Sequence, residues 1–264
     1  MDTQRIKCLA ICLSCFFFVA SCVQGTDKTN DSAGVATTGT VTDDDLGYNA
    51  VPVENGGSIS GTVTFSGTIP APRTVVITDD VEACGESVKI QDIEVNVGGG
   101  LRNAVVSLVD INSGASLETL ASSPVLEQHL CRFVPHIMFA PINQVVDILN
   151  SDPISHNIHT VAFDNRTFNR TQPPSLDKIE ASFEIAEKVK VKCDIHGWMN
   201  SWIVVVDHPY HAITDAEGNF VIENVPPGTY TLEAWHEIPG ATKRQVTIDS
   251  GQTTDLSIEL KQIS

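Results

Sequence analysis

Short runs of β-branched and aromatic residues, separated by clusters of Gly, Pro, Asn and Asp, recur along the chain and constrain its fold most. Residues 58–65 (SISGTVTF) alternate small or polar side chains with apolar ones, which is typical of a half-buried strand. Residues 103–109 (NAVVSLV) form a continuous apolar run of strand length. Helical periodicity is hard to find, so the 264-residue chain is predicted to be all-β, with one or two domains. A hydrophobic content of 42% is ample for the cores.

The N-terminus has the pattern of a secretory signal. Arg5 and Lys7 precede an apolar run, residues 8–20, that is too short to span a bilayer. The run ends at residues 19–22 (VASC), which resemble the lipobox of bacterial lipoproteins. The resemblance implies removal of residues 1–21 and lipidation of Cys22. The protein would then be lipid-anchored in the cell envelope, on the periplasmic or extracellular face. An uncleaved anchor or an ordinary secretory signal is the alternative.

Residues 22–56 are predicted to be a disordered tether, because they are rich in Thr, Asp and Gly and contain few large apolar side chains. The formal net charge of the whole chain is −17, and removal of residues 1–21, which carry a net +1, makes it −18. Nucleic-acid binding needs basic patches, so the acidic composition argues against it. Solubility, or a cationic partner, is the better explanation of the charge.

A loop between two strand-like runs carries the main candidate site. Residues 187–192 (EKVKVK) lead into it and residues 201–207 (SWIVVVD) lead out. The loop itself, residues 193–199 (CDIHGWM), spaces a Cys, a His and a Met three residues apart. Thiolate and thioether are soft ligands, which with imidazole suit copper better than Mg, Ca or Mn. A trigonal blue-copper site has two His, one Cys and a distant axial Met, so the loop predicts a second His on a neighbouring strand.

That His lies in residues 150–159 (NSDPISHNIH), and the two stretches together resemble the cupredoxins, the plastocyanin and amicyanin family of blue-copper proteins. The loop has amicyanin-like spacing, although Ser155 stands where the family usually has Pro. The resemblance implies a cupredoxin-like Greek-key β-sandwich over residues 119–206. It also implies a copper cofactor with four ligands, His156, Cys193, His196 and Met199.

Three neighbours of these ligands have predicted supporting roles. Asn157 is expected to hold the copper loop through backbone hydrogen bonds. His159 should point to the opposite face of its strand from His156 and take a polar surface or supporting role. Trp198, inside the loop, is expected either to form an apolar patch for a partner or to cap the core. The alternatives to copper are zinc, or buried Cys and Met side chains with no metal.

The C-terminal part carries a second resemblance. Residues 214–220 (TDAEGNF) and 226–230 (PPGTY) are similar to the carboxypeptidase regulatory-like domain, a transthyretin-like β-sandwich. The opening strands of that family are missing after Asp207, whereas residues 61–63 and 103–106 resemble them. We therefore predict one discontinuous sandwich, built from residues 57–118 and 207–262, with the cupredoxin-like part inserted. Two separate sandwiches are the alternative.

Two cysteines remain after those assigned to the signal peptide, to lipid and to copper. Cys84 and Cys131 are an even pair in an oxidising compartment, where disulfides persist, and we predict a bond between them. Two separate buried thiols are the alternative.

Among the remaining histidines, those considered for a further role are His136, His208, His211 and His236. They form a second metal site, a docking patch or merely scattered polar positions. No Gly-x-Ser-x-Gly, His-Glu-x-x-His or P-loop string is present, and the regulatory-like module is accessory in its family. The chain is therefore not expected to be an enzyme.

The predicted function is that of an extracytoplasmic type 1 (blue) copper protein that carries single electrons to or from a redox protein partner. One alternative is a copper-binding or copper-storage protein without a redox partner. Another is a cell-surface adhesion or carbohydrate-binding β-protein with a vestigial copper site.

Overall fold

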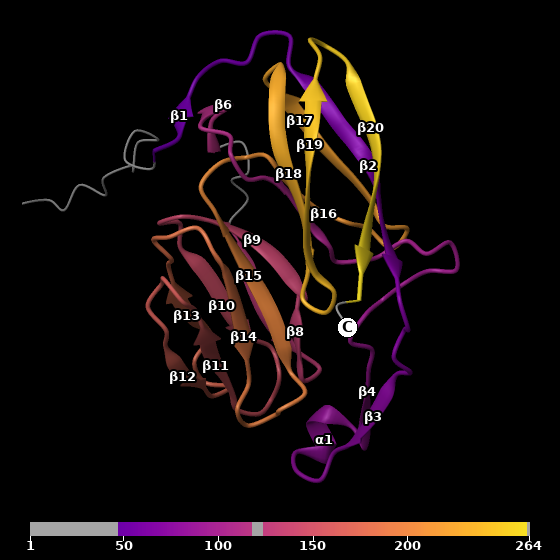
Figure 1. Cartoon of the computed structure of the whole chain (residues 1–264). Coiled ribbons are helices and arrows are strands. Elements are labelled where there is room, and N and C mark those ends of the chain that lie inside the picture. The colour runs from indigo at the N-terminus through magenta and orange to yellow at the C-terminus, as the bar shows by residue number, and fades with distance from the viewer. Residues whose placement is uncertain (1–46, 118–123, 263–264) are drawn as a thin grey trace, which may run out of the picture. The chain divides into compact units, whose positions relative to one another are not determined.

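The computed structural model describes residues 47–117 and 124–262 and shows a nearly all-β chain (Figure 1). Within these residues the single α-helix is α1 (Val81–Cys84), which is one turn long. In the same two stretches, no helix has the length and apolar character needed to cross a membrane. The predicted signal peptide, Cys22 and most of the predicted tether lie outside the described residues.

Nine strands form the central module, defined here as residues 124–206. They are β7 (Val125–His129), β8 (Arg132–Val134), β9 (Ile137–Pro141), β10 (Val146–Asn150), β11 (His156–Val161), β12 (Asn169–Gln172), β13 (Lys178–Ala181), β14 (Lys188–Lys192) and β15 (Asn200–Val206). One sheet has the order β13-β10-β7-β8 and the other β12-β11-β14-β15-β9. Leu126 and Ile148 from the first sheet and Ile158, Val191 and Ile203 from the second belong to one buried cluster. The core of the central module therefore lies between its two sheets.

The hairpin of β14 and β15 shows how the sequence determines this sheet. Val189 and Val191 are fully buried, and the three lysines that alternate with them are half-buried on the other face. The lysine stems cover aromatic rings there, with Lys190 Nζ 5.7 Å from the centroid of the Trp202 ring. Antiparallel pairing runs from Lys188 opposite Val204 to Lys192 opposite Asn200. This register fixes the ends of the loop that carries the candidate ligands.

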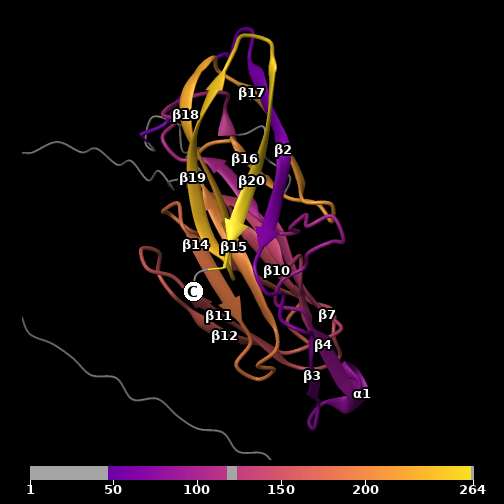
Figure 2. The same cartoon turned by 45° about the vertical axis from the view of Figure 1, so that its right-hand side comes forward.

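Seven strands form the two main sheets of the outer module, which is defined as residues 57–117 and 207–262. They are β2 (Gly57–Ser66), β5 (Val105–Leu108), β16 (His211–Ile213), β17 (Asn219–Val225), β18 (Gly228–His236), β19 (Gly240–Ile248) and β20 (Thr253–Lys261). Their sheets have the orders β16-β5-β18-β19 and β17-β2-β20. Figure 2 shows β2 beside β20, with which it pairs in parallel.

The buried core of the outer module draws on both parts of its sequence. Leu101 and Val106 precede the central module, Phe220 and Leu232 follow it, and all four belong to one cluster. Strands from both parts also share each of the two sheets. The outer module is thus one sandwich, and the central module lies between β5 and β16 in the sequence.

The β16–β17 connection depends on a glycine. Gly218 has φ +84°, and a Cβ atom there would lie 2.6 Å from the carbonyl oxygen of Val63. The Gly218 amide donates to the Asp215 carbonyl at 3.0 Å, and the Asn219 amide donates to Asp215 Oδ1 at 2.8 Å. The Asp-x-x-Gly spacing of residues 215–218 therefore supplies both the turn and its cap.

The N-terminal segment is more structured than the sequence suggested. Tyr48 is only 3% exposed and packs in the core of the outer module. β1 (Asn49–Ala50) then pairs in parallel with β6 (Ser113–Gly114). The predicted tether, residues 22–56, is therefore wrong at its C-terminal end, because an aromatic side chain and backbone pairing fix that end.

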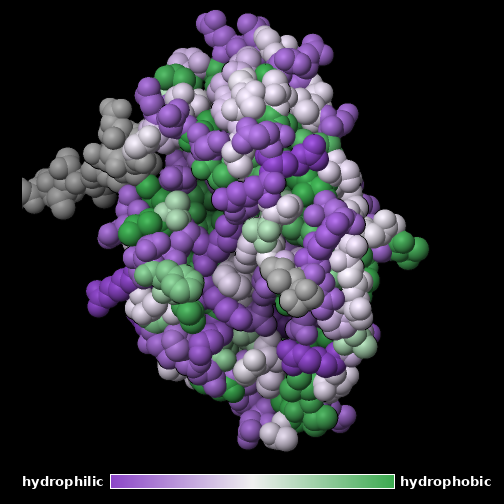
Figure 3. Space-filling model, viewed as in Figure 1, coloured by the Kyte–Doolittle hydropathy of each residue, from purple (hydrophilic) through white to green (hydrophobic). Residues whose placement is uncertain are grey.

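Short irregular segments connect the strands. Leu130 (φ +50°) and Cys131 (φ +55°) form a tight turn that separates β7 from β8. Val95 makes an isolated bridge with Leu101. β3 (Arg73–Val76) and β4 (Ser87–Ile90) flank α1 and form a hairpin. In the view of Figure 3 the surface is mostly hydrophilic, and its apolar patches are small and separate.

Candidate metal centre

The loop between β14 and β15 directs the side chains of three candidate ligands into the protein interior. The Cys193 amide donates to the Met199 carbonyl at 3.1 Å, and the Met199 amide donates to the His196 carbonyl at 2.9 Å. These two bonds close the loop on itself. As a result Cys193, His196 and Met199 are each only 2% exposed.

The fourth candidate, His156, meets the loop from the adjacent strand. It is the first residue of β11, which pairs with β14, and it is fully buried. Its Nδ1 lies 2.9 Å from Nδ1 of His196, and His196 Nδ1 lies 3.9 Å from Sγ of Cys193. The nitrogen, nitrogen and sulfur atoms of these three residues all lie within 4.8 Å of one another. Met199 shares the same buried cluster as Cys193.

The far nitrogens of both imidazoles are held by carboxylates that the sequence did not reveal as site residues. His156 Nε2 lies 2.8 Å from Asp152 Oδ2, and His196 Nε2 lies 3.1 Å from Asp80 Oδ2. A carboxylate accepts the N–H of a neutral imidazole, so this N–H is on Nε2 in each ring. Burial lowers the pKa of His156 and thus favours the neutral ring, although Asp152 opposes the shift.

This protonation pattern tests whether a metal fits the site. With both N–H groups on Nε2, the two Nδ1 lone pairs face each other at 2.9 Å, an arrangement that is repulsive without a cation or a shared proton. A histidine that binds metal usually donates its other N–H to a carboxylate or carbonyl, as both rings do here. Two imidazoles, a thiol and a nearby thioether suit copper, and the residues fit that ion.

The sulfur of Cys193 has the surroundings that a thiolate needs. The amides of Asn157 and His196 lie 3.5 and 3.3 Å from Sγ and donate to it. Asn157 also accepts the amide of Asp194 on its Oδ1 at 2.5 Å and donates from Nδ2 to Asn169. Asn157 therefore holds the start of the loop through a hydrogen bond to the backbone of Asp194.

The other two expected supporting residues lie on either side of the loop. His159 is partly exposed, and its Nδ1 bonds to Asp194 Oδ2 at 2.8 Å, on the surface rather than among the ligands. Trp198 packs its ring against His196, with the ring centroids 5.1 Å apart. Its Nε1 donates to the carbonyl of Cys131 at 3.0 Å, so Trp198 also ties the loop to the β7–β8 turn.

The predicted disulfide forms between Cys84 and Cys131, whose Cα atoms lie 5.4 Å apart. Cys131 is next to the centre, because its amide donates to Asp152 Oδ2 at 2.8 Å. Cys84 ends α1, and Asp80 is the N-cap residue of that helix. The disulfide therefore joins the two segments that hold His156 and His196.

The remaining histidines do not converge on one site. His136 Nε2 lies 2.5 Å from Glu237 Oε1, and this bond raises the pKa of His136 against the opposing effect of burial. Burial lowers the pKa of the adjacent His236 to about 4. His208 and His211 stack on each other elsewhere, with ring centroids 4.2 Å apart.

Comparisons with known proteins give one family match and several structural neighbours. Residues 202–261 match the model of the carboxypeptidase regulatory-like domain, and no curated protein matches the chain. A purple cupredoxin from Nitrosopumilus maritimus is 20% identical over 32% of this chain and 100% of its own, with a TM-score of 0.28. An oxidized mutant of amicyanin is 19% identical over 35% of this chain and 90% of its own, with a TM-score of 0.30. A copper-containing nitrite reductase from Thermus scotoductus is 15% identical over 38% of this chain and 25% of its own, with a TM-score of 0.30.

Proposed function

We propose that the chain is a blue-copper protein that carries single electrons. Copper would be held by His156 Nδ1, Cys193 Sγ and His196 Nδ1, with Met199 as the weaker fourth ligand. The observation that carries this proposal is the convergence of three buried donor atoms within 4.8 Å of one another. When bound, copper supplies the one-electron change between Cu(II) and Cu(I).

The protein's own residues would keep the centre rigid and dry. The ligand side chains are at most 2% exposed, so little water reaches them. Asp152 and Asp80 orient the two imidazoles, and the amides of Asn157 and His196 stabilise negative charge on Cys193. A site fixed in this way changes little between two oxidation states, which favours fast electron transfer.

The proposal places the protein in the cell envelope, anchored by lipid on Cys22, with a redox protein as partner. The Cys84–Cys131 disulfide supports this location, because structural disulfides persist in oxidising compartments. Replacement of Cys22 by Ala should release the protein from membranes. Persistent lipid labelling of that variant would contradict the lipobox interpretation.

Metal loading tests the function directly. The full chain, treated with Cu(II), should bind one equivalent at the centre and show an intense visible absorption that reductant removes. His156→Ala should lose this absorption, whereas the matched variant His159→Ala should keep it, because His159 bonds to Asp194 at the surface. Bound Cu(II) without an intense band would show that Cys193 is not a ligand and would contradict the proposal.

Copper storage is the second candidate, and one observation favours it. His196 is only 2% exposed, and Asp80 lies against its outer nitrogen, so the imidazole edge is covered. A carrier should exchange electrons rapidly with small redox complexes and show a reversible potential. A storage protein would retain Cu(I) tightly and exchange electrons slowly, and stopped-flow oxidation of the reduced protein separates the two.

A further inference from the structure

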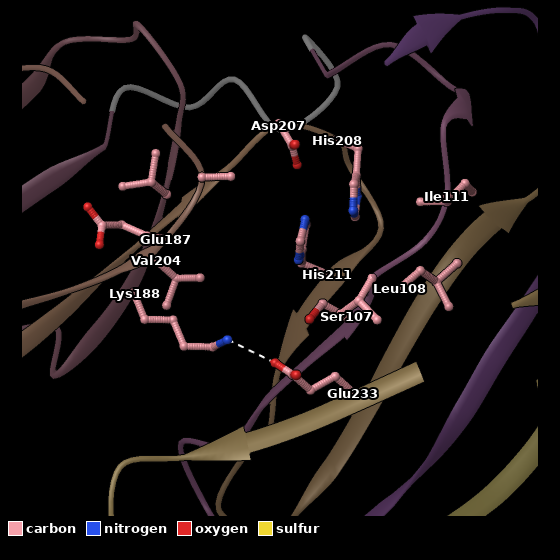
Figure 4. A pocket seen from close by; sticks show the side chains of 13 residues that line it. Ser107, Leu108, Ile111, Glu187, Lys188, Val204, Asp207, His208, His211 and Glu233 are labelled. Atoms are coloured by element: carbon pink, nitrogen blue, oxygen red, sulfur yellow. Dashed lines mark hydrogen bonds and ion pairs between the residues drawn. The ribbon is translucent and has the colours of Figure 1, made fainter. Parts of the chain in front are cut away.

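A second cluster of metal-ligating side chains lies where the chain passes from β15 into β16 (Figure 4). Asp207 and His208 follow β15, and His211 is the first residue of β16. They line a cavity of about 290 Å³ whose other walls include Ser107, Lys188 and Glu233. The cavity thus has walls from both the central and the outer module.

The three side chains can offer their donor atoms to one ion. A carboxylate oxygen of Asp207 and one ring nitrogen from each of His208 and His211 lie within 4.8 Å of one another. The two rings are nearly parallel, with an angle of 8° between their planes. Because a metal binds in the plane of each imidazole, at least one of the two stacked rings would have to rotate for both to bind the same ion.

His211 provides the independent sign that something is bound. Both of its ring nitrogens are inaccessible to solvent and have no hydrogen-bond partner among the described residues. Buried polar atoms in native proteins are almost always bonded, and an orphan points to an ion or a water molecule.

His208 has the protonation state that a ligand needs. Its Nδ1 accepts the amide of Tyr210 at 3.2 Å. The lone pair is therefore on Nδ1, and the ring proton is on the other nitrogen. A metal bound at Nδ1 would replace the contact with the Tyr210 amide.

The nearby charged groups leave Asp207 as the available carboxylate. Glu233 is paired with Lys188 at 2.8 Å and with Lys243 at 3.4 Å. Glu187 accepts backbone amides, including that of Asn165 at 2.6 Å. Asp207 faces the two rings, as Figure 4 shows.

We propose that Asp207, His208 and His211 form a second metal site, which binds a divalent ion of the zinc type. Two imidazoles and one carboxylate with an open fourth position are a common zinc donor set. The site has neither thiolate nor thioether, so it lacks the soft ligands that favour Cu(I) at the first centre. β15 separates Met199 from Asp207, and at about 3.3 Å per residue the two centres lie roughly 26 Å apart along it.

The test uses the full chain carrying Cys193→Ser and His156→Ala, so that the first centre cannot bind and its failure or success does not affect the result. Titration with Zn²⁺ should show one bound equivalent, with an affinity typical of a site that has three protein ligands. Co²⁺ serves as an optical probe of the same site. Adding His211→Gln should weaken Zn²⁺ binding at least about tenfold. Adding His159→Ala instead, which removes a surface imidazole, should not change it.

A second measurement guards against misfolding. Zn²⁺ should raise the Tm of the parent variant and should not raise that of the variant with His211→Gln, while both keep the same β-type circular dichroism. Absence of a bound equivalent in the parent would overturn the proposal. Unchanged Zn²⁺ affinity after His211→Gln would overturn it as well.

Discussion

Asp80 and His196 are in contact across 116 residues of sequence, with Asp80 Oδ2 3.1 Å from His196 Nε2. The other imidazole, that of His156, is held in the same way by Asp152, which also accepts the amide of Cys131. Because Cys131 is bonded to Cys84 in α1, one disulfide links the segment that contains Asp80 to the turn that Asp152 holds. The centre is thus positioned by its own loop and by a segment of the outer module's sequence.

Replacement of Cys193 by Ser should abolish the intense visible absorption of the copper-loaded protein. A hydroxyl cannot replace the thiolate as the donor of charge-transfer intensity, although the two imidazoles remain. The absorption spectrum and the copper content of the variant provide the measurement. A band of full strength in Cys193→Ser would exclude this residue as a ligand.

Met199→Gln should retain copper and change its reduction potential, since an axial ligand tunes such a site and does not create it. Redox titration of the loaded variant measures the change. Met138→Leu is the matched control, because Met138 is buried in the same core but lies on β9. Equal potentials in the two variants would place Met199 outside the ligand set.

Asp152→Asn should weaken copper binding by roughly 10- to 100-fold, as the loss of a carboxylate behind a ligand histidine usually does. Competition with a chelator gives the affinity. Asp147→Asn is the control, because Asp147 pairs with Lys178 at the surface of β10. If both variants bind copper equally, Asp152 supports only the β7–β8 turn, where it accepts the amides of Leu130 and Cys131.

Removal of the disulfide by Cys84→Ala with Cys131→Ala should lower the free energy of unfolding of the apo protein by at most about 4 kcal/mol. This value is the chain-entropy estimate for a bridge that closes a loop of 47 residues. Urea denaturation measures it. A reductant should destabilise the parent by a similar amount and leave the double variant unaffected, and a reductant effect of equal size on both would show that the bridge is not its cause.

Acid should destabilise the protein partly through His236. Its pKa is about 4 in the folded state because of burial, against 6.5 for a free side chain. Between these two pKa values His236 is protonated in the unfolded chain and neutral in the folded chain. The free energy of unfolding therefore falls as the pH drops from about 6.5 to 4. His236→Gln should reduce this loss by up to about 3 kcal/mol in urea titrations at pH 7.5 and 4. An identical pH dependence in the two proteins would remove His236 as the cause.

The sequence predicted the parts of the centre that are local in the chain. Cys193, His196 and Met199 share one hairpin loop, and the strand pattern on either side was strong enough to place it. Asp152 lies four residues before His156 and could have been suspected from that spacing. Asp80 could not, because only the fold brings it to His196.

Other differences between expectation and structure have physical causes of the same kind. The break between β7 and β8 depends on positive φ at Leu130 and Cys131, which neither residue type favours. The carboxylate of Asp152 compensates by accepting both amides. Likewise, Tyr48 can pack only against a completed outer-module core. The composition of residues 22–56 does not reveal this packing, so the predicted tether extends too far toward the C-terminus.

The position of β2 in its sheet has a consequence for the order of folding. Both of its neighbours, β17 and β20, are made after the entire central module, and Ser60 meets Asp255 across 195 residues. A nascent chain therefore carries β2 with two open edges, a template for intermolecular pairing, until synthesis passes residue 219. Translation that stops within the central module would leave those edges exposed, so the outer sheet closes only on chains in which the loop with the candidate metal ligands has been synthesised.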